Sequence, residues 1–321
     1  MASLPRGRKG ARPNFVHGLA RLLRRGASLR PRMTLASPVQ SLPRQRPAPH
    51  IVDVLIAERA PRLAASPIWP LARPLLYALL DYRKARRMAD AIAPLSGQAA
   101  LDHVSDLLAL KVEARGLERT PPSRRLIVVC NHPTGIADGI AVNDALRRVR
   151  SDLCFYANAD ARRVSPRLDE VLIPVEWIEA KRTRQSARLT LEATRAAMEA
   201  ERCLVIFPSG RLARRQADGR LLDPPWAPTA IAVARKHRAP VLPIHVAGPW
   251  STLFHLFHGW SQELRDITLF HELLNKRGGR FALTVGAPIP PEALAGDAAE
   301  ITKRLKAHVE ETLPANPDAG V

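Results

Sequence analysis

The chain has 321 residues, of which 46% are hydrophobic, enough for one catalytic domain with appendages. It contains no run of 18 uninterrupted apolar residues, so the sequence predicts no membrane-spanning helix. The formal net charge of +19 favours an anionic partner, such as nucleic acid, anionic lipid or a phosphorylated substrate. Cys130, Cys154 and Cys203 lie in or beside apolar runs without a CxxC pair, and we expect buried thiols in a reducing compartment.

Residues 1–50 contain eleven Lys and Arg but neither Asp nor Glu, and they are rich in Pro and Ser. This composition predicts a disordered basic tail. Within it, residues 15–29 have the apolar spacing of a short basic amphipathic helix that could lie on an anionic membrane. A solvated tail without a defined partner is the alternative. Its apolar stretches are too short, and too often interrupted by Arg, for a secretory signal.

Residues 51–110 predict a helical, membrane-associating region. An apolar stretch over 68–80, interrupted by Arg73 and Pro74, runs into a basic cluster at 83–87. This pattern is too short to span a bilayer but suits a helix lying among lipid head groups. An ordinary helix packed on the main domain is the alternative. Residues 98–110 predict a second amphipathic helix.

Residues 111–315 predict an α/β domain with a mainly parallel central sheet flanked by helices, because apolar strand candidates alternate with helix candidates. Strands are expected at 126–130, 153–157, 171–175, 203–207, 241–246 and 281–285. Helices are expected at 138–148, 183–201, 227–237 and 297–313. Within 183–201, Ala187, Leu191, Thr194 and Met198 line one face at helical spacing.

The first strand of this series ends at Asn131-His132, and Asp138 follows at the start of the next predicted helix. An imidazole is thereby expected at the carboxyl end of a buried strand, where open α/β sheets bind their ligands. A His–Asp pair can act as a general base with its orienting partner. The alternative is a loop histidine bonded to Asp138 acting as the N-cap of the helix.

Two further strand ends carry unusual residues. The apolar run 203–207 is followed by Pro208-Ser209-Gly210, a tight-turn sequence, and then by three arginines: Arg211, Arg214 and Arg215. Guanidinium groups suit a phosphate or carboxylate, although a solvated basic loop is the alternative. The run 241–246, which contains Pro243, opens onto a Gly-Pro loop.

In this order, the blocks resemble those of the glycerolipid acyltransferase family, of the lysophosphatidic acid acyltransferase type, over about residues 111–290. Five residues rather than the family's usual four separate His132 from Asp138, a form similar to a bacterial branch sometimes labelled hemolysin-like. Ser209 stands where the family usually has Glu, and Arg211 is one place early. These departures leave the identity of the acceptor open. Arg162 lies where the family often has a basic contact to the acceptor, but a helix-surface charge is the alternative.

The resemblance implies acyl transfer from a fatty acyl thioester to a lipid hydroxyl, with His132 as general base and Asp138 fixing its tautomer. Asn131, Pro208 and Pro243 would support the motifs. Arg211, Arg214 or Arg215, with Ser209 and Gly210, would bind the acceptor's phosphate. Backbone amides of the turn at 208–210 are candidates for an oxyanion hole. No metal and no cofactor are expected, since acyl-CoA or acyl carrier protein would serve as cosubstrate.

The expected reaction converts lysophosphatidic acid to phosphatidic acid. A lyso-ornithine lipid or another bacterial lysolipid as acceptor, or a non-catalytic member that binds anionic lipid, are the alternatives. We expect a peripheral protein on the cytoplasmic side of the membrane, with anionic lipids, the lysolipid and the acyl donor as partners. No nucleic-acid partner is expected, and the oligomeric state stays open.

A hydrolase, a metalloenzyme and a nucleic-acid-binding protein each fit the sequence less well. A hydrolase of the nucleophile-elbow type would need a Gly-x-Ser-x-Gly motif, which is absent. His255 and His258 have metal-compatible spacing, and His271-Glu272 begins like a zincin motif, but position 275 is Asn rather than His. The chain carries none of the known nucleic-acid-binding motifs.

Overall fold

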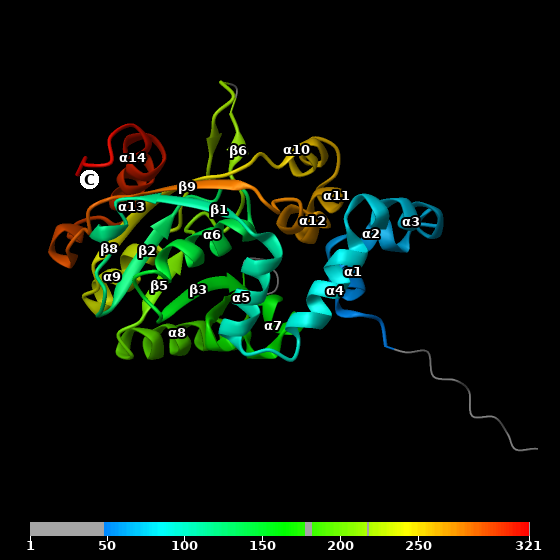
Figure 1. Ribbon diagram of the computed structural model, residues 1–321, viewed down its shortest axis with the longest axis horizontal. Helices are drawn as coiled ribbons and strands as arrows, with labels where there is room; N and C mark the ends of the chain where they lie inside the picture. Colours follow the sequence, from blue (N-terminus) through cyan, green and yellow to red (C-terminus); the bar gives the residue numbers. More distant parts are fainter. Residues whose placement is uncertain (1–47, 177–181, 217, 321) are drawn as a thin grey trace, which may run out of the picture. The chain divides into compact units, whose positions relative to one another are not determined.

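A seven-stranded sheet in the order β1-β9-β8-β2-β5-β3-β4 organises the fold (Figure 1). The computed structural model describes residues 48–176, 182–216 and 218–320, so the predicted tail and its 15–29 helix lie almost wholly outside the described residues. The strands of the sheet are β1 (Lys111–Arg115), β2 (Leu126–Cys130), β3 (Leu153–Asn158), β4 (Leu172–Val175), β5 (Cys203–Ile206), β8 (Val241–Ala247) and β9 (Arg280–Val285). A separate antiparallel hairpin joins β6 (Arg214–Arg215) to β7 (Leu221–Leu222).

Five neighbouring strands, from β8 to β4, run parallel, which confirms the predicted mainly parallel sheet. β9 pairs antiparallel with β8, and β1 pairs parallel with β9, so these two strands run the opposite way. All six strands expected from their apolar pattern are present, within one or two residues at their ends.

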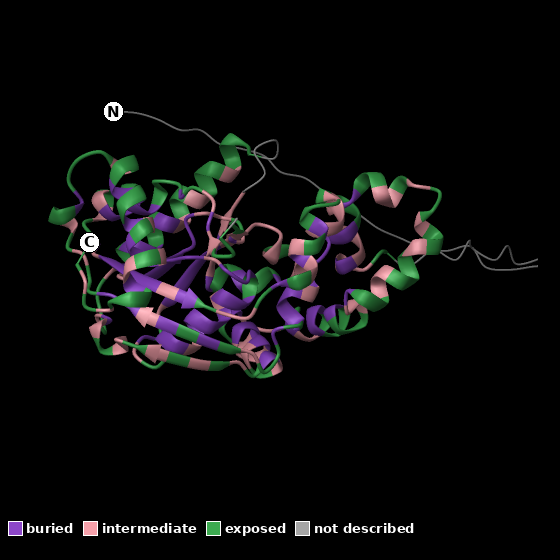
Figure 2. Cartoon of the chain, turned by 90° about the horizontal axis from the view of Figure 1, so that it is seen from above, coloured by how far each residue is buried: buried purple, intermediate pink, exposed green. Residues whose placement is uncertain are grey.

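Helices cover both faces of the sheet, as Figure 1 shows. Because side chains alternate along a strand, Val128 and Cys130 of β2 join one core cluster while Ile127 and Val129 join the other. The first cluster includes side chains from α4, α5, α6 and α12, and the second from α8, α9 and α13. Burial is continuous in the central strands β2 and β5, whereas the edge strand β1 alternates between exposed and half-buried residues (Figure 2).

The α-helices that follow β2 in the described residues include those expected at 138–148, 183–201, 227–237 and 297–313. They are α6 (Ile136–Leu146), α7 (Ala161–Val164), α8 (Arg184–Glu199), α9 (Thr229–His237), α10 (Thr252–His258), α11 (Gln262–Asp266), α12 (Leu269–Leu274), α13 (Ala298–Ala307) and α14 (Leu313–Ala315). On α8 only the second half of the expected face packs on the sheet: Thr194 and Met198 are buried, whereas Ala187 and Leu191 are exposed.

Five helices precede the sheet and pack with it, since Ala48–Val321 form one compact unit. They are α1 (Ile51–Arg59), α2 (Pro61–Ala65), α3 (Trp69–Leu79), α4 (Tyr82–Ile92) and α5 (Gly97–Leu108). α3 is held on one side by Tyr77, which stacks on Tyr82 at 3.9 Å between ring centroids. Both tyrosine hydroxyls donate to Asp53 of α1.

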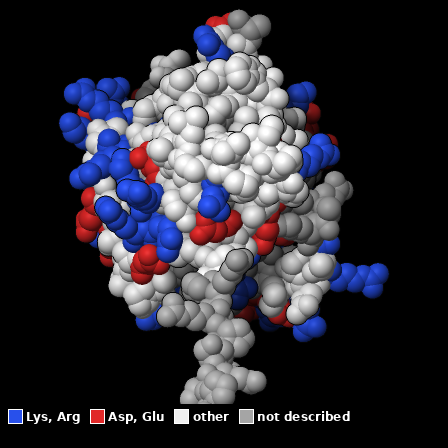
Figure 3. All heavy atoms as spheres, turned by 90° about the vertical axis from the view of Figure 1, so that its right-hand side faces the viewer, with Lys and Arg blue, Asp and Glu red and all other residues white. Residues whose placement is uncertain are grey.

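The other side of α3 is an apolar stripe exposed to solvent. Leu71 and Leu75 are 82% and 74% exposed, and Ile68 and Leu79 continue the stripe at helical spacing. Figure 3 looks onto the side where α2 and α3 lie, and shows a broad uncharged area with Lys and Arg gathered along one edge. In the described part of the chain, no helix has both the length and the apolar character needed to cross a bilayer.

The three cysteines are free and buried, as expected. Burial raises the pKa of each thiol, to about 11 for Cys154, so none is poised to form a thiolate near neutral pH.

Candidate active site

Three loops that carry the predicted motifs meet at one edge of the sheet. β8, β2 and β5 are neighbours and run parallel, so their carboxyl ends lie side by side. Asn131 and His132 follow β2, the segment 207–213 follows β5, and the segment 248–250 follows β8. The topology therefore brings together three motifs that are spread over more than 100 residues of the sequence.

His132 and Asp138 form the predicted pair. His132 Nδ1 lies 2.9 Å from Asp138 Oδ2. Because a carboxylate only accepts hydrogen bonds, Nδ1 carries the proton, and Nε2 is the ring nitrogen available to take a proton from a substrate. The imidazole packs on Phe207 with 4.5 Å between ring centroids, and the His132 side chain keeps 16% of its surface exposed.

Asp138 is fully buried, and its carboxylate is held by the loop that it follows. The backbone amides of Thr134 and Gly135 donate to Oδ2 at 2.9 and 3.0 Å, and the Thr134 hydroxyl donates to Oδ1 at 2.6 Å. The alternative, in which Asp138 is the N-cap of this helix, does not hold. The N-cap is Gly135, with φ +95°, α6 begins at Ile136, and Asp138 is the third helical residue, reaching back to the N-cap amide as in a capping box.

Asn131 and Pro243 tie the strand ends together. The Asn131 side-chain amide donates to the Val246 carbonyl at 2.9 Å and its oxygen accepts from the Val246 amide at 2.7 Å, so the side chain extends the β2–β8 pairing by one step. Pro243 pairs in register with Val129, and its carbonyl accepts from the Gly286 amide at 2.9 Å. Both residues therefore position the strands that carry the His132 loop.

Asp223 is a site residue that the sequence analysis missed. Its buried carboxylate accepts from the His132 backbone amide at 3.0 Å and from the Trp226 indole at 2.9 Å. Burial raises the pKa of Asp223 to about 6, against the lowering effect of His132 and of the Trp226 hydrogen bond. The only local signal is Asp223 three positions before Trp226 in a Pro-rich loop, which by itself indicates no chemistry.

The Pro208-Ser209-Gly210 turn is built as expected, but one of its amides is already used. Gly210, at φ +58°, donates its N–H to the Phe207 carbonyl at 3.0 Å, so it is not an oxyanion-hole donor. The Ser209 hydroxyl donates to the Arg211 carbonyl at 2.8 Å, and the Pro208 carbonyl accepts from Ala227. Arg211 itself is exposed.

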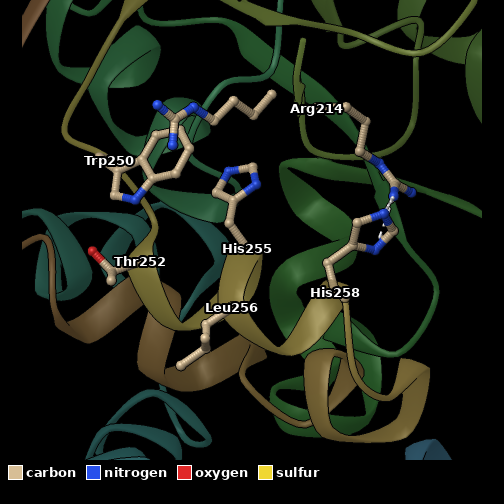
Figure 4. Close-up of a pocket in the computed structure, with 8 residues that line it drawn as sticks. Arg214, Trp250, Thr252, His255, Leu256 and His258 are labelled. Carbon is tan, nitrogen blue, oxygen red and sulfur yellow. Dashed lines mark hydrogen bonds between the residues drawn. The ribbon is translucent and has the colours of Figure 1, made fainter. Parts of the chain in front are cut away.

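Arg214 and Arg215 lie on β6 and line a pocket of about 470 Å³ with α10 and the loop before it, which we call the α10 pocket. It is lined by Arg214, Arg215, Trp250, Thr252, His255, Leu256, His258 and Gly259. Figure 4 shows Arg214 and His258 pointing toward each other and Trp250 lying against His255. Arg162 instead forms an ion pair with Asp169 at 2.6 Å, as a helix-surface charge would.

The histidines considered as metal ligands have other surroundings. His271 Nδ1 contacts Asp81 at 3.0 Å, whereas His255 and His258 line the α10 pocket. Among the described residues no cluster of three or more His, Cys, Asp or Glu side chains could hold a metal ion.

The chain resembles known proteins in sequence. The family model described as Acyltransferase matches residues 111–247. A lyso-glycine lipid O-acyltransferase of Phocaeicola vulgatus is 28% identical over 196 residues, covering 59% of this chain and 68% of the relative. The corresponding protein of Bacteroides thetaiotaomicron is 26% identical, covering 59% and 70%.

A solved structure, that of the 1-acyl-sn-glycerophosphate acyltransferase from Thermotoga maritima, matches with a TM-score of 0.43 and 16% identity, covering 84% of this chain and 98% of that one. The family-model match covers the strands and loops that carry His132, Asp138 and the arginine block. The family-model match over residues 111–247 and the two curated relatives support the glycerolipid acyltransferase family for this chain.

Proposed function

We propose that this protein transfers a fatty acyl group from an acyl thioester to the hydroxyl of a lysolipid, with His132 as the general base. The observation that carries the proposal is the 2.9 Å contact between His132 Nδ1 and the fully buried Asp138 carboxylate. This contact fixes the tautomer in which Nε2 accepts a proton, as general-base catalysis on an alcohol requires.

In the proposed step the lysolipid oxygen attacks the thioester carbonyl while His132 Nε2 removes the hydroxyl proton. The new C–O ester bond forms, the C–S bond breaks, and the proton passes from the imidazolium to the departing thiolate. Asp138 stabilises the transient imidazolium charge and does not itself take the proton. The donor is acyl-CoA or acyl carrier protein, and no further cofactor takes part.

For the acceptor, a lyso-glycine lipid is the first candidate, because the two curated relatives act on lipids of that name. Lysophosphatidic acid is the second, because the order of the motif blocks resembles that of its acyltransferases. Because Ser209 replaces the family's usual Glu and leaves the acceptor open, the lyso-glycine lipid and lysophosphatidic acid should both be tested. A lyso-ornithine lipid or another bacterial lysolipid belongs in the same acceptor panel.

We further propose that the protein works as a peripheral protein on the cytoplasmic side of a membrane, with anionic lipids as partners. The support is the exposed apolar stripe of α3 together with the exposed basic side chains Arg83, Lys84, Arg86 and Arg87 on α4. Apolar side chains can enter the acyl boundary while nearby cations meet anionic head groups.

The deciding experiment is an acyl-transfer assay followed by mass spectrometry. Purified wild type and His132→Ala each receive acyl-CoA or acyl carrier protein with the panel of lysolipids. Loss of a general base lowers the rate by about 10²–10⁴-fold, so the product should form with wild type and nearly vanish with the variant. Near-wild-type turnover by folded His132→Ala would reject His132 as the general base. If wild type transferred no acyl group to any acceptor, the proposed acyltransferase activity would be rejected.

A further inference from the structure

Glu272 of α12 and Lys276 of the turn after it form an ion pair in the protein interior. Lys276 Nζ lies 3.1 Å from Glu272 Oε2, and the two side chains are only 2% and 5% exposed. Lys and Glu are almost never buried so completely unless they are paired, because moving an ion out of water is costly. The remaining partners of the pair lie in the first turn of α10 and in residues 248–251, which we call the β8–α10 connection.

The hydrogen bonds of the pair hold the end of the β8–α10 connection. Lys276 Nζ donates to Ser251 Oγ at 3.0 Å and lies 3.4 Å from the Trp250 carbonyl oxygen. With Glu272 Oε2, these oxygens match the three N–H donors of an ammonium group. Glu272 Oε1 accepts from the Phe254 amide at 3.3 Å. The two charged groups therefore fix both the end of the connection and the first turn of α10.

The other end of the β8–α10 connection packs on the loop that holds the candidate catalytic pair. Gly248 approaches so closely that a Cβ there would lie 2.7 Å from the Thr134 methyl group. The Thr134 amide and hydroxyl in turn donate to the Asp138 carboxylate. Pro249 packs on the turn that carries the lysine, since a Cβ on Gly279 would lie 3.2 Å from the proline Cγ. The connection therefore lies between the buried ion pair and the loop of the candidate base, in contact with both.

Stability alone does not account for this arrangement. The mutual attraction of a buried ion pair is largely offset by the cost of taking both ions out of water, and apolar side chains of similar volume often serve as well or better. Apolar contacts are non-directional, however, whereas the hydrogen bonds of Glu272 and Lys276 require their partners at set distances and angles. The pair is therefore better suited to fixing the place of the β8–α10 connection than to stabilising the fold.

We propose that Glu272 and Lys276 are positioning residues for the His132 site. They fix the β8–α10 connection, and Gly248 of that connection keeps the neighbouring loop where Asp138 meets His132 Nδ1. Without the pair the connection is free to shift, and the contact between Asp138 and His132 loosens while the fold remains. This inference rests on the proposed function and adds to it two residues that touch no reacting atom.

The test replaces both ions at once. Glu272→Leu with Lys276→Met keeps similar side-chain volumes and leaves no unpaired charge, so the midpoint of thermal unfolding should match or exceed that of wild type. Lys276→Met alone leaves the Glu272 carboxylate buried without its cation and should lower the midpoint by about 5–10 °C. Arg150→Met with Asp152→Asn is the matched control, because this buried arginine forms its ion pair just before β3, at the opposite edge of the sheet from His132.

Two measurements separate positioning from stability. In the double variant at 272 and 276, kcat for acyl transfer should fall about 10–100-fold with the KM of the acceptor nearly unchanged, because a shift of the catalytic groups slows the chemistry without removing a substrate contact. The second measurement needs no turnover. The NMR signal of the His132 Nδ1 proton, assigned by its loss in His132→Ala, should show faster exchange with water once the contact with Asp138 loosens.

The control should change neither kcat nor the Nδ1 signal. An Nδ1 signal that behaves alike in wild type and in the double variant would overturn the proposal, whatever the activity. A double variant as unstable as Lys276→Met would also overturn it, since the pair would then serve stability, and so would an equal loss of kcat in the control. If wild type transferred no acyl group, the proposed function would fail, while the NMR comparison would still decide the positioning role.

Discussion

The backbone amide of His132 donates to the buried carboxylate of Asp223, 91 positions further along the chain. Asp223 also receives the Trp226 indole, and its own amide donates to Glu310 at 2.6 Å. The candidate base is therefore fixed from two sides: Asp138 orients its ring and Asp223 holds its backbone. Asp223 does not touch the reacting atoms, so we assign it a positioning role.

Asp223 should make stability depend on pH between about 4 and 6. The pKa of Asp223 is about 6 in the folded protein, against an ordinary value of 3.8 for an aspartate carboxyl. A folded pKa raised above the unfolded one gives stability that is fully present below the unfolded pKa and is lost as pH rises through the folded pKa. Relative to Asp223→Asn, the unfolding free energy of wild type should thus fall by about 3 kcal/mol from pH 3.8 to above 6.

Urea titrations of both proteins across this pH range measure the difference. The variant is the reference because Asn cannot titrate, so the other carboxylates cancel in the comparison. A difference that stays constant with pH would mean that Asp223 keeps the same proton affinity in both states.

The sequence predicted the sheet and the His132–Asp138 pair because both follow from local patterns. An apolar β-branched run indicates a buried strand, and parallel strands bring their carboxyl ends to one edge. Asp223 and the α10 pocket could not be predicted in this way, because their partners come from segments far apart in sequence. The antiparallel direction of β9 relative to β8 could not be predicted either, because an apolar strand pattern does not indicate in which direction the strand runs.

The exact start of α6 could not be predicted from residue types alone. Asp138 looked like an N-cap by residue type, but Gly135 takes that place with φ +95°, a backbone conformation that glycine adopts without strain. The shift of three residues turns Asp138 inward, where it meets His132 Nδ1. Cap preferences alone do not distinguish the N-cap from the third helical residue, since Asp suits both.

Asp138→Asn should fold and lose most of its activity. An Asn oxygen can replace Oδ2 as acceptor for His132, and its amide can donate to the Thr134 hydroxyl, so most of the hydrogen bonds survive. The negative charge that stabilises the imidazolium is lost, and we expect a rate about 10²–10⁴-fold lower. Single-turnover acyl transfer measures the rate, with Asp144→Asn, on the same helix and bonded to Ser105, as control.

The exposed stripe of α3 should be needed for membrane binding. Leu71→Glu with Leu75→Glu removes two side chains that would each contribute about 1.5–3 kcal/mol on burial, so vesicle binding should fall more than tenfold. Co-sedimentation with vesicles containing anionic lipid measures it. Leu191→Glu is the matched control, because Leu191 is 62% exposed but lies on α8. Equal effects of both changes would indicate nonspecific hydrophobic adsorption instead.

Gly248→Ala should disturb the loop that holds the candidate catalytic pair, His132 and Asp138. An added Cβ would lie 2.6 Å from the Phe281 ring and 2.7 Å from the Thr134 methyl group, closer than real contacts allow. Relief requires a shift of Thr134, whose amide and hydroxyl bind Asp138. Overpacking of this kind costs about 1–3 kcal/mol, and we expect a lower midpoint of thermal unfolding together with reduced kcat.

Thermal unfolding and steady-state acyl transfer measure the two effects of Gly248→Ala. Gly320→Ala is the control for the substitution itself, because a Cβ there would meet nothing within 4 Å. If Gly248→Ala lowered stability but left kcat unchanged, the strain would be absorbed by Phe281 alone. The close packing of Gly248 on Thr134 would then have no part in holding Asp138 against His132.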